Sequence, residues 1–311
     1  MQLTILACGD GARELVAVTR HFSPTVIAGT AEDITLCGLR VCPDLDALTD
    51  VLTFAARSTR QTHRVESALR EVDAAPEWYR LDDVTIARAI ARSQWLGLGI
   101  GLSEITARLA GDLGGARLLP MCDQPVEAHV VVEPVAPVAD GLTMEDEETP
   151  PLRAVHVREW LAGGQGRVVR TTAAGLNAAR PSPEVLEAIR SADLVVVPLT
   201  APLTGIGVML SLPGMRDTLR GTSAPVVGIS PALLDRRGEE DALLAPLDLR
   251  CTSADVGGLF VDVLDGYLVP HDDLDACRGG YWRDVVVVAT AEDADLLGPV
   301  LDVAERLGVT P

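Results

Sequence analysis

The sequence predicts an α/β fold: a Rossmann-like, doubly wound and mostly parallel sheet with an additional smaller α+β subdomain. Three observations support this fold class. Short apolar runs alternate with stretches of helical periodicity along most of the chain, as strand–helix units do. The runs 193–198, 224–229 and 285–289 are apolar almost throughout, as expected of parallel strands with both faces covered. The first apolar run, 3–7, leads through two glycines into a helical stretch.

The elements of the N-terminal half follow from two local patterns. We assign strands to short apolar runs, and helices to segments whose apolar residues recur every three or four positions. In chain order we expect a strand at 3–7, a helix at 12–22, a strand at 25–28, a long loop at 29–43, helices at 44–56, 62–72, 83–96 and 103–113, and strands at 117–119 and 127–132.

Residues 133–151 differ in composition from the rest of the chain. They carry four prolines around the acidic run Glu145-Asp146-Glu147-Glu148, which is typical of an exposed linker or an elaborated hairpin. We therefore expect one Rossmann-like domain over 1–311, with a helical and β-hairpin insertion subdomain at 47–175 that contains this acidic, proline-rich linker.

Helix caps organise the C-terminal half. Two strand-like runs, at 155–159 and 167–171, are followed by Ser182-Pro183-Glu184. That order places a capping serine before a proline and an acid in the first turn, so it predicts the start of a helix. At the end of the chain, Thr290 opens a last helix with a start like a capping box, and Gly308 is its expected C-cap.

Charge and composition exclude several classes of function. Among 311 residues, 26 Lys+Arg oppose 45 Asp+Glu, a net charge of −19. Such a chain repels nucleic-acid phosphates and anionic lipid, so we expect neither nucleic acid nor a membrane as a partner. No apolar run reaches the roughly 18 residues of a membrane span. The first residues resemble a strand and not a signal peptide, so we expect a cytoplasmic protein.

Two residue types narrow the chemistry further. The chain has no lysine, which excludes Schiff-base catalysis and the lysine of a phosphate-binding P-loop. Six cysteines form no Cys-x-x-Cys pair, so we expect reduced thiols and not a metal site or a disulfide framework.

The loop after the first strand is a candidate phosphate site. Ligands of doubly wound sheets bind beyond the carboxyl ends of the strands. Gly9 and Gly11 let the backbone approach a ligand there, a helix N-terminus offers N–H groups to a phosphate, and Arg13 supplies positive charge. The alternative is a tight turn that needs glycine only for a positive φ.

Four carboxylates follow the second strand: Glu32, Asp33, Asp44 and Asp46. In an extended segment after Pro43, Asp44 and Asp46 would point to the same side, like a pair awaiting Mg²⁺. Alternatively, Asp44 caps the following helix and serves the backbone. We expect Asp46→Asn to weaken metal-dependent ligand binding with little change in stability.

Other loops offer further candidates. Asp83 precedes a helix, where the alternative is a simple N-terminal cap. Thr200, Pro202 and Thr204 lie in a rigid loop whose hydroxyls suit contact with a nucleotide; the alternative is an ordinary strand-to-helix connection. Asp123, in the loop before a strand, is a weaker candidate.

These loops carry runs that resemble the 2-phospho-L-lactate transferase family, collinearly over roughly residues 1–270. The most specific runs are Thr-Ala-Glu-Asp (30–33) and Gly-Leu-Arg-Val-Cys-Pro-Asp-Leu-Asp (38–46). Supporting runs are Glu-Trp-Tyr-Arg-Leu (77–81), Ala-Arg-Leu-Leu-Pro-Met-Cys-Asp (116–123), Ser-Leu-Pro-Gly-Met-Arg (211–216) and Ala-Pro-Val-Val-Gly-Ile-Ser-Pro (224–231).

The resemblance implies a Mg²⁺-dependent transfer in the biosynthesis of the deazaflavin coenzyme F-420, usually by a homodimer. A ribityl hydroxyl of a deazaflavin precursor attacks a phosphorus of a guanosine-diphospho-linked lactate or enolpyruvate, and GMP leaves. By matching positions, Asp44 and Asp46 are the expected catalytic residues, and Glu32, Asp33 and Asp46 are the expected metal ligands. The residues expected to contact the substrates are Gly9, Gly11, Arg13, Asp83, Asp123, Thr200, Pro202 and Thr204.

Several positions depart from the family pattern. The first loop is one residue shorter and holds Asp10, and the nucleotide loop has Thr200-Ala201-Pro202 where the family has Ser-Asn-Pro. Two alternatives to the transferase therefore stay open: a catalytically impaired paralogue that acts as a binding or regulatory module, and a nucleotide-sugar-binding regulator.

Overall fold

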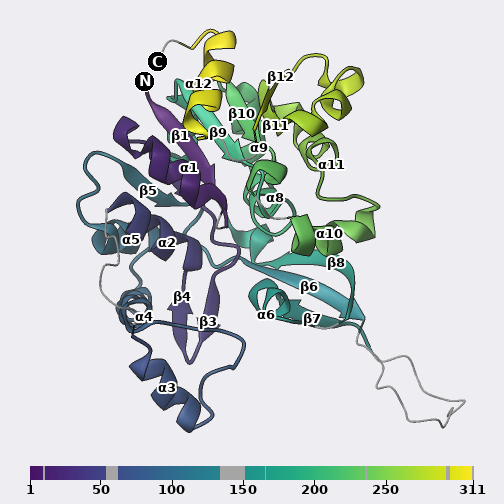
Figure 1. The fold of residues 1–311 in the computed structure, drawn as a ribbon. Coiled ribbons are helices and arrows are strands. Elements are labelled where there is room, and N and C mark those ends of the chain that lie inside the picture. Colours follow the sequence, from purple (N-terminus) through teal and green to yellow (C-terminus); the bar gives the residue numbers. More distant parts are fainter. Residues whose placement is uncertain are drawn as a thin grey trace, which may run out of the picture.

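Seven parallel strands form the main sheet (Figure 1). The computed structural model describes residues 1–9, 11–53, 62–133, 151–164, 166–234, 237–291 and 295–309. The strand order is β12-β11-β10-β9-β1-β2-β5, and each neighbouring pair is parallel, which confirms the predicted fold class. The strands are β1 (Leu3–Ala7), β2 (Thr25–Ala28), β5 (Arg117–Pro120), β9 (Leu194–Pro198), β10 (Val226–Ile229), β11 (Gly266–Pro270) and β12 (Val286–Thr290).

Both faces of this sheet are buried, because alternate side chains of each central strand pack into different cores. Leu6 and Val195 belong to one core, and Ile5 and Val196 belong to the other. Helices α7 (Pro183–Arg190), α8 (Ile206–Leu210), α9 (Met215–Gly221) and α11 (Ser253–Gly258) contribute to the first core. Helices α1 (Gly11–Thr19), α2 (Pro43–Leu52) and α12 (Leu297–Arg306) contribute to the second.

The order of strands reverses at β1. From β1 the chain proceeds to β2 and β5 at one edge, then returns to β9 on the other side of β1 and continues to β10, β11 and β12. In open α/β sheets the ligand crevice lies beyond the carboxyl ends of the strands at such a reversal. The loops after β1, β2 and β9 therefore lie where a ligand site is expected.

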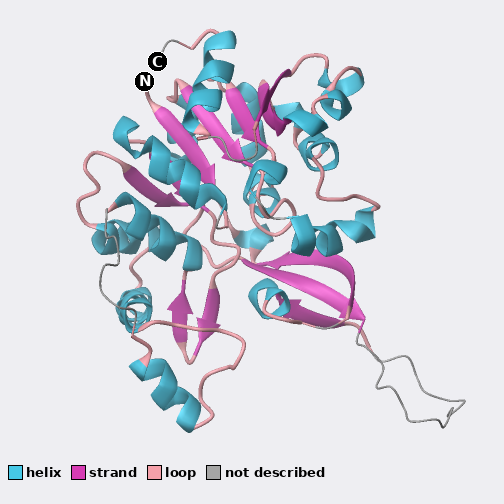
Figure 2. Ribbon diagram, viewed as in Figure 1, coloured by secondary structure: helices cyan, strands magenta, loops and turns pink. Residues whose placement is uncertain are grey.

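Smaller elements lie beyond those carboxyl ends (Figure 2). One group is the antiparallel hairpin of β3 (Ile34–Leu36) and β4 (Leu39–Val41), with α3 (Arg64–Glu71) and α4 (Asp83–Gly97); α5 (Leu102–Ala110) follows α4 and packs on β5 of the main sheet. The other is an antiparallel sheet of β7 (Arg153–His156), β6 (Glu127–Glu133) and β8 (Arg167–Ala174), with α6 (Val157–Leu161) and α10 (Arg237–Leu244).

The predicted insertion at 47–175 contains most of these elements, but it also contains β5, an edge strand of the main sheet. Its boundaries as a separate subdomain stay a prediction. Most of the predicted linker at 133–151 lies outside the described residues.

Three local predictions were wrong. The segment 29–43 is not only a loop, since it contains the β3–β4 hairpin (34–41), whose strands of three residues leave too short an alternation to detect. The predicted strand at 155–159 becomes helix α6 after His156, whose side chain accepts a hydrogen bond from the Arg158 backbone. The last helix begins at Leu297 instead of Thr290, and residues 292–294 lie outside the described part.

Two predicted caps are confirmed. The Ser182 side chain accepts a hydrogen bond from the backbone of Val185 at the start of α7. Gly308 follows α12 with φ 89°, the left-handed conformation that favours glycine after a helix.

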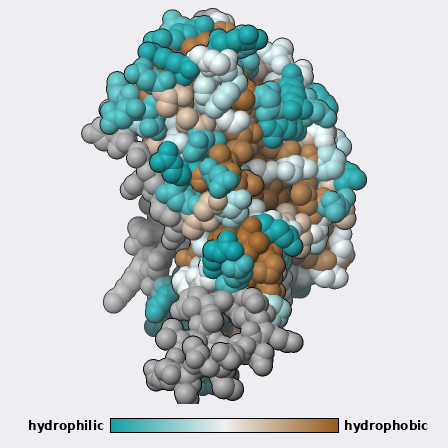
Figure 3. All heavy atoms as spheres, turned by 90° about the vertical axis from the view of Figure 1, so that its right-hand side faces the viewer, coloured by the Kyte–Doolittle hydropathy of each residue, from teal (hydrophilic) through white to brown (hydrophobic). Residues whose placement is uncertain are grey.

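One face of the protein carries apolar side chains at its surface (Figure 3). Around α8 and β8 lies a groove of about 300 Å³, lined among others by Leu176, Leu203, Val208 and Phe260.

In the described part of the chain, no helix is both long enough and apolar enough to cross a lipid bilayer. All six cysteines lie in the described part of the chain, and none of them forms a disulfide there. The homodimer stays a prediction.

Candidate active site

The loops after β1, β2 and β9 meet as the strand order predicts. The Thr200 hydroxyl donates a hydrogen bond to the carbonyl oxygen of Cys8, with an O···O distance of 2.6 Å. The backbone N–H of Gly9 donates to Oδ2 of Asp44 at 3.0 Å. These two contacts join the glycine turn after β1 to the nucleotide-loop candidate on one side and to the acidic residues on the other.

The two glycines of the turn are required for different reasons. Gly9 has φ +67° and open space where a Cβ would lie, so its backbone conformation is what requires glycine. A Cβ on Gly11 would lie 2.6 Å from Cγ2 of Thr200, so close packing excludes a side chain there. The tight-turn alternative therefore applies to Gly9 and not to Gly11.

We expect Gly11→Ala to destabilise the protein by about 1–3 kcal/mol, the usual cost of overpacking a buried contact. Thr200→Ser removes the methyl group that would clash but keeps the hydroxyl that bonds to Cys8. The double variant should therefore recover most of the lost stability in urea unfolding. A Gly11→Ala variant as stable as the wild type would contradict this packing.

Asp44 faces the glycine turn and does not cap its helix. Pro43 occupies the first turn of α2, and the N-cap residue, Cys42, makes no side-chain cap. Because α2 begins at Pro43, Asp44 and Asp46 lie two helical positions apart, roughly 200° around the axis. They therefore do not point to the same side, and the prediction of a same-side pair was wrong.

The electrostatics of Asp44 are those of a buried acid beside another acid. The pKa of Asp44 is raised to about 8. Burial is the larger cause, and the negative charge of the nearby Glu32 carboxylate is the second. The Gly9 N–H and the Arg158 guanidinium oppose this rise in pKa. A cation or a hydrogen-bond donor placed beside these two carboxylates would therefore be stabilised.

Asp46 has an internal partner. Its Oδ1 lies 2.6 Å from Nη2 of Arg92 and its Oδ2 lies 3.3 Å from Nη1, and both side chains are buried. The pair ties α2 to α4. Arg92 engages both carboxylate oxygens of Asp46, although Asp46 lies near enough to Asp33 to raise the pKa of that carboxyl. The metal and catalytic roles expected of Asp46 stay predictions.

Asp33 has weaker polar contacts than Glu32, the other acid of the loop after β2. Its side chain is 1% exposed, and neither carboxylate oxygen has a hydrogen-bond partner of normal geometry. Burial raises its pKa to about 7, against the opposing effects of the Arg40 guanidinium, 3.7 Å from Oδ2, and the Cys42 thiol. This carboxylate is therefore poised to exchange a proton near neutral pH.

Glu32 forms an ion pair with Arg158, which in turn contacts Tyr79. Oε2 of Glu32 lies 3.0 Å from Nε of Arg158 on α6. The same guanidinium lies over the ring of Tyr79, 6.0 Å from its centroid. Burial raises the pKa of Tyr79 to about 12, so its hydroxyl keeps its proton.

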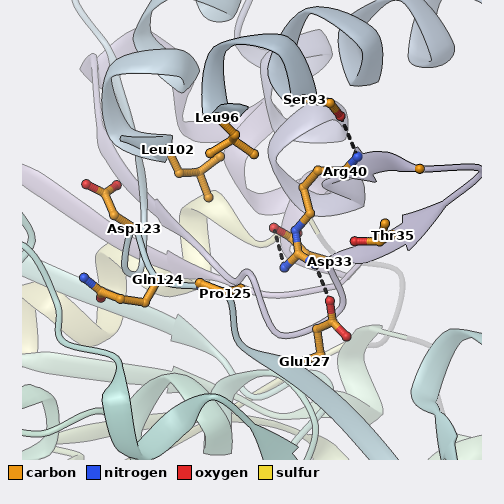
Figure 4. Close-up of a pocket in the computed structure, with 11 residues that line it drawn as sticks. Asp33, Thr35, Arg40, Ser93, Leu96, Leu102, Asp123, Gln124, Pro125 and Glu127 are labelled. Atoms are coloured by element: carbon orange, nitrogen blue, oxygen red, sulfur yellow. Dashed lines mark hydrogen bonds and ion pairs between the residues drawn. The ribbon is translucent and has the colours of Figure 1, made fainter. Parts of the chain in front are cut away.

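A pocket of about 380 Å³ opens beside Asp33 (Figure 4). Leu96, Leu102 and Pro125 give it an apolar wall, and Asp33, Arg40 and Glu127 lie together at its other side. Arg40 forms a close ion pair with Glu127, and its backbone N–H donates to Ser93. The complete lining is Asp33, Thr35, Gly38, Arg40, Ser93, Leu96, Leu102, Asp123, Gln124, Pro125 and Glu127.

The remaining predicted residues lie in four different settings. Asp123 lines this pocket and also caps α5 by accepting from the backbone and hydroxyl of Ser103. Asp83 lies away from it and accepts hydrogen bonds from Thr62 and Val65 at the start of α3.

The other settings are the α1 surface and the loop after β9. Arg13 is exposed in the first turn of α1. Pro202 and Thr204 are buried in the loop after β9. That loop packs closely on the β1 turn, since a Cβ on Gly205 would lie 2.9 Å from Cβ of Cys8.

The acidic loop fits a magnesium ion only as a partial shell. Among the described residues, no group of three or more His, Cys, Asp or Glu side chains is arranged to hold a metal ion. Protein-bound Mg²⁺, however, is commonly held by one or two carboxylates together with substrate phosphates and water. Asp44 and Glu32 form a carboxylate pair of this kind, since the charge of Glu32 raises the pKa of Asp44.

The basic and aromatic partners of the acids were not predicted from the sequence. Arg40, Arg92, Arg158 and Tyr79 come from the hairpin, α4, α6 and the segment before α4. An acidic chain that binds an anion requires locally clustered arginines, but no spacing in the sequence shows which arginines these are.

Comparisons with known proteins show the family and the fold of the chain. A family model described as 2-phospho-L-lactate transferase CofD matches residues 3–296. A phosphoenolpyruvate transferase of Streptomyces griseus is 36% identical over 99% of this chain and 99% of its own. The enzyme of that name from Thermobifida fusca is 37% identical over 90% and 89% of the two chains. A UPF0052-family structure from Bacillus halodurans shares the fold, with TM-score 0.56, 16% identity and coverage of 99% and 90%.

Proposed function

The chain belongs to the 2-phospho-L-lactate transferase CofD family, and on that premise we propose which reaction its site performs. In this proposal it transfers a phospho-linked three-carbon acid from a guanosine-diphospho donor to the ribityl hydroxyl of a deazaflavin precursor, with release of GMP. Two of the most similar relatives, those of S. griseus and T. fusca, bear the name phosphoenolpyruvate transferase, which favours the phosphoenolpyruvyl over the phospholactyl group.

The observation that carries the proposal is the position of Asp33. Its buried carboxylate, without a hydrogen-bond partner, lines the apolar-walled pocket and belongs to the same loop as Glu32, beside Asp44 and the glycine turn. A planar acceptor in the pocket and a diphosphate at the turn would therefore meet at the acidic loop. The proposed general base is Asp33, since a base must lie within reach of the hydroxyl that it deprotonates.

The chain's own groups then have distinct roles. Asp33 takes the proton of the acceptor hydroxyl as that oxygen forms its bond to the β-phosphorus and the bond between this phosphorus and the GMP oxygen breaks. The start of α1 at Gly11 and the charge of Arg13 are proposed to hold the phosphates, while the N–H of Gly9 is occupied by Asp44. Mg²⁺ bound by Asp44 and Glu32 would supply neutralisation of phosphate charge.

The test is product formation. The full chain is incubated with Mg²⁺, the deazaflavin precursor and the guanosine-diphospho-linked enolpyruvate or lactate, and GMP and the coupled product are measured. We expect turnover, with enolpyruvate preferred. Stabilisation by GDP and Mg²⁺ without product would instead indicate a catalytically impaired paralogue. Stabilisation by a UDP-sugar alone would indicate a nucleotide-sugar-binding regulator.

The role of Asp33 also predicts the pH dependence of the reaction. The pKa of Asp33 is raised to about 7, and only the ionised form accepts a proton. We therefore expect kcat/KM to be full above this pKa and to fall about tenfold per unit as the pH is lowered below it. The profile should be measured with saturating Mg²⁺. A profile that stays flat down to pH 5 would contradict this assignment.

A further inference from the structure

His156 connects the acidic loop to the helix that carries Arg158. It is buried at the junction of β7 and α6, where it is the N-cap residue of α6. Its Nδ1 accepts a hydrogen bond from the Arg158 backbone N–H at 3.2 Å, and its Nε2 lies 3.3 Å from the carbonyl oxygen of Asp33. Because Nδ1 accepts, the proton of the neutral ring lies on Nε2, which therefore donates to Asp33.

The side chain of Arg158 returns to the same loop. Its Nε lies 3.0 Å from Oε2 of Glu32, and its charge opposes the raised pKa of Asp44. One imidazole thus holds the backbone of Asp33 with one nitrogen and the first turn of α6 with the other. The antiparallel β6–β8 sheet is connected to the acidic loop through this ring.

We propose that His156 is a positioning residue, which sets the place of Arg158 against Glu32 and thereby the charge balance at the site proposed for the diphosphate. The identity of that ligand rests on the proposed function. The geometry of the clasp of His156, Arg158 and the acidic loop does not depend on it. Burial lowers the pKa of His156 to about 4, so the ring is neutral near pH 7, as its two hydrogen bonds require.

The chain provides a matched control in His129. This residue lies directly opposite His156 in the β6–β7 pair, with the ring centroids 5.4 Å apart. Its Nδ1 faces the carbonyl oxygen of Glu127, 3.1 Å away, instead of the acidic loop. His129→Ala therefore removes a similar ring from the same small sheet without removing either contact of the clasp.

Two conservative variants separate the two contacts. In His156→Asn the amide oxygen can replace the cap acceptor near Nδ1, whereas in His156→Gln the amide nitrogen can replace the donor near Nε2. We expect His156→Ala to weaken binding of GDP with Mg²⁺ about tenfold, the size typical of losing a partner that orients a site residue. His156→Asn should retain more of the affinity than His156→Ala, because it keeps the cap of the helix that carries Arg158. His129→Ala should stay within about twofold of the wild type.

The decisive measurement is a double-mutant cycle with Arg158→Met. Affinity for GDP with Mg²⁺ is measured by calorimetry, and kcat and KM are measured in parallel. If His156 acts through Arg158, then His156→Ala has no further effect in the Arg158→Met background. Equal losses in both backgrounds, or an equal loss in His129→Ala, would overturn the proposal.

The same double-mutant cycle is also measured by urea unfolding without ligand. This measurement tests the positioning role of His156 independently of the proposed function. A wild-type chain that neither binds GDP nor forms product would overturn the proposed function alone. The positioning role would then be decided by the unfolding data. Shifts of the urea midpoint that are non-additive between His156→Ala and Arg158→Met would support the clasp, and additive shifts would overturn it.

Discussion

Asp33→Asn is expected to lower kcat of the proposed transfer by about 10²–10⁴-fold, the usual contribution of a general base. Asparagine has nearly the same shape as aspartate but cannot take the proton of the acceptor hydroxyl. Stability should change little, because Arg40 keeps its ion pair with Glu127 when the Asp33 charge is removed, and burial already disfavours that charge. Steady-state kinetics and urea unfolding of the same preparation measure both effects.

A suitable control for this variant is Asp50→Asn. Asp50 is a half-buried carboxylate on α2 that pairs with Arg88, 2.7 Å away, and it does not line the pocket. Its removal should leave kcat within a fewfold of the wild type. An Asp33→Asn enzyme that keeps more than a tenth of the wild-type kcat would show that another group accepts the proton, and Asp44 would be the next candidate.

Asp46→Asn is expected to destabilise the protein by about 3–5 kcal/mol, because it leaves the buried Arg92 charge without its counter-ion. This reverses the sequence-based expectation that the substitution changes stability little. The reason is that the pair spans α2 and α4, where burial raises the pKa of Asp46 even beside Arg92. Urea unfolding measures the loss.

Replacing both members of the pair distinguishes a lost charge partner from a general intolerance of substitution. The double variant Asp46→Leu, Arg92→Met buries apolar groups in place of the two charges, and such replacements are often neutral or stabilising. It should be at least as stable as Asp46→Asn, and more stable than Arg92→Met alone. An Asp46→Asn protein with wild-type stability would show that the pair is not needed for packing of α2 on α4.

Much of the fold could be predicted from local patterns. The uninterrupted apolar runs of β9 and β10 indicated buried parallel strands, and Ser182-Pro183-Glu184 marked the start of α7. The weaker local signals failed: β11 begins with a glycine, and the hairpin strands have only three residues each. In such segments long-range pairing forms the strand, and local preference contributes little.

The sequence by itself determined the fold class and which loops meet at the carboxyl edge, because periodicity, caps and glycine turns are properties of neighbouring residues. It could not determine which of the acids have an ion-pair or hydrogen-bond partner and which do not. Only the tertiary structure showed that Asp46 is neutralised by Arg92, that Glu32 faces Arg158, and that Asp33 has no hydrogen-bond partner in its pocket. Those partners come from elements far apart in the chain, and packing alone sets the distances and the burial on which their charges depend.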